Sequence, residues 1–158
     1  MTAQMTEPAT VEPVLDRIQT TRTSFDTAVA RLTDEQFTAA GAEGQWSVKD
    51  LVAHVATWEQ GIAALLQHEP RFAAMGVADY SPSMDIDTVN DRLYELHQDR
   101  PSGEVLAMAR EAHERAVAVI ASLCDDDLQR PYRDYAGEDR PDADEPIINW
   151  IAGDTYEH

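Results

Sequence analysis

Apolar residues recur three or four positions apart along most of this 158-residue chain, and no stretch alternates apolar and polar residues as a strand does. The spacing predicts an all-α fold. Four main helices pack as a bundle with long loops, and a shorter helical piece joins them. We place the main helices at 11–32, 47–67, 102–123 and from Pro146 onward, and the shorter piece at 85–99.

Local signals define several of these boundaries. Ser47 is a good N-cap for the second helix. Pro146 suits the first turn of the last one, where its missing N–H costs nothing. No stop signal precedes His158, so we expect the last helix to run to that residue. Residues 1–10 are expected to form a flexible tail, and 11–158 a single domain by length.

Composition excludes several classes of partner. The chain has 30 acidic and 12 basic residues, for a formal charge of −18. This charge repels phosphate backbones and anionic lipid, so neither nucleic-acid nor membrane binding is expected. Cys124 is the only cysteine, which rules out an internal disulfide. The polar first ten residues do not resemble a signal peptide, and we expect a cytoplasmic protein.

The last predicted helix carries an unusual face. Ile147, Ile151, Asp154 and His158 share one side, so an apolar stripe turns into a carboxylate and an imidazole. Burying these groups is costly unless something pairs with both. Asp154 and His158 are one helical turn apart, a spacing at which two side chains can bind one cation.

The second helix supplies a candidate third ligand. His54 interrupts an apolar face between Leu51 and Trp58. Two histidines and a carboxylate, with open positions for water or substrate, would suit Zn, Ni, Fe or Mn. Alternatively, His54 is a hydrogen-bonded core residue, or the three groups bond only to one another. We interpret the other histidines as surface residues: His68, His97 and His113.

A connection of unusual length follows the second helix. Residues 68–84 are expected to form a loop that covers a pocket at the bundle end, with apolar lining from Phe72, Met75 and Tyr80. Gly61, inside the preceding helix, either permits close packing or leaves space for a ligand.

Two segments carry a family resemblance. The segment 46–54, WSVKDLVAH, resembles the second-helix motif of the DinB-like four-helix bundles. These include bacillithiol and mycothiol S-transferases and mycothiol-dependent maleylpyruvate isomerases. The closing segment 150–158, WIAGDTYEH, more narrowly resembles the ClbS/DfsB family, as does 90–101. Together the resemblance covers nearly the whole chain after residue 10.

This resemblance implies an up-down-down-up bundle, usually a dimer, with a divalent-metal site in many members. The ligand positions fall on His54, Asp154 and His158, and ClbS/DfsB members often carry Asn where this chain has Asp154. Zinc or nickel is the first candidate cofactor, and a low-molecular-weight thiol the second. Glu59, Tyr156 and Glu157 are candidate partners of the ligands.

The implied function is detoxification of a small electrophile by a metal-dependent hydrolase or thiol S-transferase. ClbS-type members open a reactive cyclopropane, and others in the superfamily transfer a thiol. Two alternatives stay open. One is a metal-free ClbS-type cyclopropane hydrolase that uses acid–base residues. The other is a non-catalytic bundle that binds a small ligand or only dimerises.

Overall fold

The computed structural model describes residues 8, 10–137 and 140–158. Most of the tail expected at 1–10 therefore lies outside the described residues. The described chain contains helices, loops and two isolated bridge pairs, which confirms the all-α prediction. Its elements, in order, are α1 (Val11–Ala30), α2 (Asp34–Thr38), α3 (Val48–Leu66), α4 (Arg71–Ala74), α5 (Ile86–His97), α6 (Ser102–Ala121), the 3-10 helix η1 (Asp125–Gln129), α7 (Arg133–Ala136) and α8 (Ile148–Asp154).

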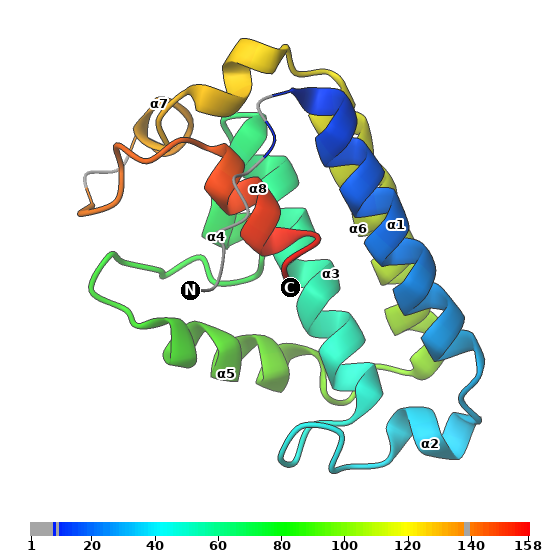
Figure 1. Cartoon of the computed structure of the whole chain (residues 1–158). Coiled ribbons are helices and arrows are strands. Elements are labelled where there is room, and N and C mark those ends of the chain that lie inside the picture. Colours follow the sequence, from blue (N-terminus) through cyan, green and yellow to red (C-terminus); the bar gives the residue numbers. More distant parts are fainter. Residues whose placement is uncertain (1–7, 9, 138–139) are drawn as a thin grey trace, which may run out of the picture.

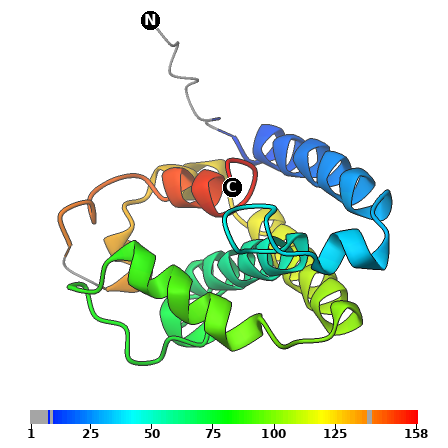
Figure 2. The same ribbon diagram turned by 90° about the horizontal axis from the view of Figure 1, so that it is seen from below.

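Four of these helices form the bundle (Figure 1). α1 and α8 run in one direction, and α3 and α6 run in the other, the up-down-down-up order that the resemblance implies. Seen from below, α1 lies along one side and α5 along the other, with α3 and α6 between them (Figure 2). Among the described helices, none combines the length and apolar character that a bilayer span requires.

α3 is the central helix because its sequence leaves little of it polar. Twelve of its 19 residues are buried, and it packs against α4, α5, α6 and α8. Its start is a capping box: Ser47 Oγ accepts the Asp50 N–H at 3.1 Å, and Asp50 Oδ2 accepts the Ser47 N–H at 2.8 Å. The predicted N-cap is therefore confirmed.

Three groups of buried side chains form the core. One joins α1, α3, α6 and α8 through residues such as Ile18, Ile62 and Ile151. A second joins the first half of α3 to α6 and α2. The third lies between α3, α4 and α5 and includes Trp58, Phe72 and Leu93. This third group supports one wall of the cavity described below.

The last helix is shorter than its pattern predicts. α8 ends at Asp154, because Thr155 has φ −126° and ψ −95°, outside the helical region. Glycine and β-branched residues are poor helix formers, and Gly153 and Thr155 flank that end. The expectation that one helix carries both Asp154 and His158 is therefore wrong. His158 reaches its position through a turn.

Candidate functional site

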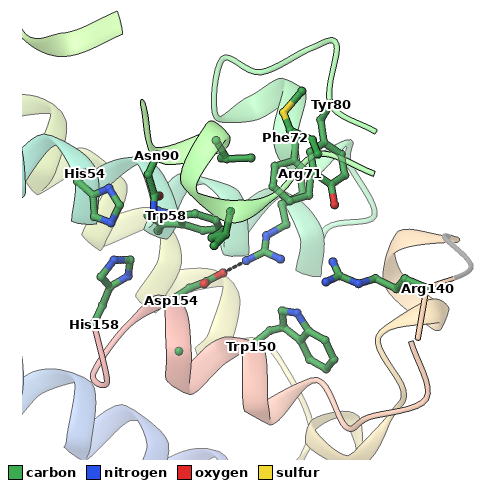
Figure 3. Close-up of a pocket in the computed structure, with 14 residues that line it drawn as sticks. His54, Trp58, Arg71, Phe72, Tyr80, Asn90, Arg140, Trp150, Asp154 and His158 are labelled. Atoms are coloured by element: carbon green, nitrogen blue, oxygen red, sulfur yellow. Dashed lines mark hydrogen bonds and ion pairs between the residues drawn. The ribbon is translucent and has the colours of Figure 1, made fainter. Parts of the chain in front are cut away.

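A cavity of about 370 Å³ opens where α3, α4, α5 and α8 meet (Figure 3). One end holds two histidines, the middle holds Arg71 and Asp154, and Arg140 lies at the other end. Aromatic and aliphatic side chains share its walls with charged and polar ones. The lining residues are His54, Trp58, Arg71, Phe72, Tyr80, Met84, Ile86, Val89, Asn90, Arg140, Trp150, Gly153, Asp154 and His158.

His54 and His158 form an edge-to-face pair. Their ring centroids are 4.7 Å apart with an interplanar angle of 78°. Burial lowers the pKa of His54 to about 4, and a positive charge on His158 adds to this shift. Burial also lowers the pKa of His158, although the Glu59 carboxylate opposes the change. Both rings are therefore neutral at pH 7, and each keeps a nitrogen lone pair for a proton or a cation.

Asp154 is close to this pair in the cavity but is bonded elsewhere. Its Oδ2 accepts a hydrogen bond from Arg71 Nη2, and the two side chains are 11% and 5% exposed. The guanidinium carbon of Arg71 also lies 5.3 Å from the Trp58 ring centroid. Burial raises the pKa of Asp154 to about 6, and Arg71 opposes that rise by favouring the carboxylate.

These positions bear on the predicted metal ligands. The structure brings His54 and His158 together, but the Asp154 carboxylate is engaged by Arg71. Among the residues that the structure describes, no group of three or more His, Cys, Asp or Glu side chains is arranged to hold a metal ion. Imidazole nitrogens are ordinary ligands of a divalent cation, whereas the carboxylate, as placed, is bonded to Arg71. The three-ligand site remains a prediction.

Arg71 is the site residue that the pattern does not single out. The available signal was indirect: a buried carboxylate at Asp154 requires a cationic partner. Arg71 comes from the long connection over 68–84, whose Phe72 and Tyr80 line the cavity as predicted. Met75 instead packs on Gly61, where an added Cβ would lie 2.5 Å from its Sδ. Gly61 therefore serves close packing.

Behind His158 lies a second polar cluster. Glu59 is buried, and its carboxylate is 3.3 Å from Arg22 Nη1 and 3.0 Å from His113 Nδ1. A smaller cavity of about 160 Å³ is lined by these residues and by His158. The interpretation of His113 as a surface residue is therefore wrong. His97 is also buried, with Nε2 3.1 Å from Thr57 Oγ1, whereas His68 is exposed.

Unpartnered polar atoms gather around the large cavity. In the described part of the chain, six buried side-chain polar atoms have no hydrogen-bond partner. Four belong to cavity residues: His54 Nδ1, Trp58 Nε1, Arg71 Nε and Asn90 Oδ1. Each such group costs about 1–3 kcal/mol when buried. This concentration is typical of a site that completes its bonding with a ligand.

Comparison with known proteins identifies the family. The model of the DinB superfamily matches residues 17–158. Searches of curated proteins and of solved structures give no match to this chain. The family match covers the bundle and the residues that line the large cavity. The chain belongs to the DinB superfamily.

Proposed function

We propose that the large cavity is the active site of an enzyme that detoxifies a small electrophile by hydrolysis or by transfer of a low-molecular-weight thiol. One observation carries the proposal: His54 and His158 lie together at the end of a cavity of mixed polar and apolar lining, four of whose polar atoms are unpartnered. The resemblance of 150–158 to the ClbS/DfsB family supports hydrolysis.

His158 is the base in this proposal. A neutral imidazole can take a proton from water or a thiol bound beside it. Because a positive charge on one ring opposes a charge on the other, only one ring of the pair is protonated at a time. The Glu59 carboxylate favours that charge on His158. His54 then orients the nucleophile by a hydrogen bond.

The deprotonated oxygen or sulfur attacks an electrophilic carbon, a new C–O or C–S bond forms, and the bond to the leaving atom breaks. That atom takes the electron pair, and the imidazolium returns the proton to it. Phe72, Tyr80 and Trp150 line the same cavity and supply apolar contacts for the body of the electrophile.

The proposal includes a divalent-metal cofactor, with zinc or nickel as the first candidate. His54 and His158 would hold this ion. Asp154 would join only after leaving Arg71, so we assign no step to the metal. When bound, such an ion lowers the pKa of water toward about 7. Metal analysis of freshly purified protein tests this. A stoichiometric metal content in wild type that falls in His54→Ala would support the metal site. A substoichiometric content that His54→Ala does not change would refute it.

Turnover of reactive probes tests the enzyme itself. Wild type is incubated with an activated cyclopropane or an epoxide, with and without a small thiol, and the products are followed by mass spectrometry. We expect His158→Asn to lower the rate at least 100-fold, and the exposed His68→Gln to leave it unchanged. A chelator separates the metal-dependent from the metal-free route. Equal rates in His158→Asn and wild type would refute the proposal and favour a non-catalytic, ligand-binding bundle.

From the same resemblance, we also propose that the protein forms a homodimer. Sedimentation velocity at two protein concentrations measures this directly. A single species at the monomer mass at both concentrations would contradict it.

A further inference from the structure

The large cavity is lined by more cationic than anionic groups, unlike the chain as a whole. The whole sequence carries −18, yet the ionised residues that line the cavity are Arg71, Arg140 and Asp154. Asp154 bonds to Arg71, and Asp142, which is not a lining residue, bonds to Arg140. An anion that enters the cavity can therefore bind only to an arginine that releases its carboxylate partner.

The two arginines are held differently. Arg71 is buried against Asp154, and breaking that pair would leave a charge without compensation. Arg140 bonds to Asp142, with Nε 2.5 Å from Oδ1 and Nη2 3.2 Å from Oδ2. Asp142 is 38% exposed, so this pair is worth no more than about 1 kcal/mol. Arg140 can exchange Asp142 for another carboxylate at little cost.

The direction of Arg140 matches this role. Figure 3 shows its side chain pointing into the cavity toward Arg71, with Trp150 beside the space between them. Flat side chains form the walls here: Phe72 and Tyr80 are stacked, with centroids 3.5 Å apart and an interplanar angle of 14°. Guanidinium groups match the planar geometry of a carboxylate, and aromatic rings pack well on flat conjugated ligands.

We propose that the cavity binds a small, flat, conjugated carboxylic acid. Its carboxylate bonds to Arg140, its planar body lies along Trp150, Phe72 and Tyr80, and its far end reaches the histidine pair. The unpartnered Trp58 Nε1–H and Asn90 Oδ1 lie on residues along this path and supply one donor and one acceptor for polar substituents. The inference names a substrate class and in that respect rests on the proposed function.

Binding of trans-cinnamate, measured by isothermal titration calorimetry on the full chain, tests the inference. The neutral analogue is cinnamamide. We expect cinnamate to bind wild type at least 10-fold more tightly than cinnamamide does. Arg140→Gln should weaken cinnamate at least 10-fold and leave cinnamamide unchanged. Asp142→Asn should tighten cinnamate two- to fivefold, because it removes the internal competitor for Arg140.

Two further variants act as controls. Arg133→Gln removes another partly exposed arginine, which pairs with Asp144 at 2.6 Å and does not line the cavity, so cinnamate affinity should stay within twofold. Arg140→Lys keeps the charge without the planar fork and should give an intermediate loss. Circular dichroism checks the fold of each variant.

Several results would overturn the inference: no cinnamate binding at 10 mM, equal affinity for acid and amide, or equal effects of Arg140→Gln and Arg133→Gln. His158→Asn separates this test from that of the proposed function. Arg140-dependent binding retained without any turnover in wild type would refute the enzyme and keep the binding site. If His158→Asn abolishes turnover but Arg140→Gln does not change cinnamate binding, the enzyme proposal stands and the carboxylate-binding site is refuted.

Discussion

Asp154 and Glu59 are two buried carboxylates in the two cavities that share His158, and their surroundings differ. Glu59 on α3 is bonded by Arg22 of α1 and His113 of α6, so one carboxylate links three helices. Among the described residues, Asp154 at the end of α8 has one ionic partner, Arg71.

The atoms nearby differ in the same way. None of Arg22, Glu59 and His113 has a buried side-chain polar atom without a partner in the described structure, whereas four lining residues of the Asp154 cavity do. A polar network that is fully bonded stabilises a unique arrangement of helices. One that is incompletely bonded beside an open cavity retains capacity for a ligand. We therefore assign the bonds of Glu59 to Arg22 and His113 to the fold, beside its electrostatic effect on His158, and the Asp154 side to function.

The largest expected effect comes from removing the single partner of Asp154. Arg71→Met leaves a buried carboxylate uncompensated, so we expect the unfolding free energy at pH 7 to fall by about 3–5 kcal/mol in urea titrations. The loss should shrink at pH 5, where Asp154 takes up a proton. The double variant Arg71→Met/Asp154→Leu should be more stable than Arg71→Met alone. If it is not, the pair is less important than its burial indicates.

A smaller effect is expected at the doubly bonded carboxylate. Glu59→Gln should cost about 2 kcal/mol, because Arg22 keeps its bond to the exposed carboxylate of Asp26 at 2.8 Å. Urea unfolding measures this against Glu69→Gln, whose exposed pair with Arg115 should contribute less than about 0.5 kcal/mol. A loss for Glu59→Gln larger than that for Arg71→Met would reverse the comparison.

The smallest effect depends on pH and concerns His54. Its pKa is about 4 in the folded state and near 6.5 when unfolded, so protons bind preferentially to the unfolded chain below pH 6.5. Stability linked to His54 is present above pH 6.5 and is lost as the pH falls toward 4. Because the ring is partly exposed, we expect this pH-dependent contribution to the unfolding free energy to be about 1–2 kcal/mol.

His54→Gln removes that dependence and is the matched control. The difference in unfolding free energy between wild type and His54→Gln should narrow or reverse from pH 7 to pH 4. A constant difference across this range would mean that the histidine pair is open to water, and the contrast between the two cavities would weaken.

Particular residues show how far the sequence could be interpreted. The apolar spacing of α1, α3 and α6, and the Ser47 cap, identified the helices, because these signals act between residues three or four positions apart. The break in apolar periodicity indicated that His54 and His158 lie together, which they do, although a turn and not the predicted helix carries His158. The same reasoning placed Asp154 with them and missed Arg71, since nothing local to 68–84 indicates which residue reaches Asp154.

The sequence by itself determined an all-helical bundle, because periodic burial fixes which faces turn inward, and its motifs indicated the DinB superfamily. It also predicted that His54 and His158 lie together, but through a helix that the structure ends at Asp154. Only the tertiary structure decided that Asp154 bonds to Arg71, that α8 stops before His158, and that His113 joins Glu59. These depend on long-range partners and on the geometry of one turn, because a buried charge is satisfied by whichever opposite group the whole fold brings within reach.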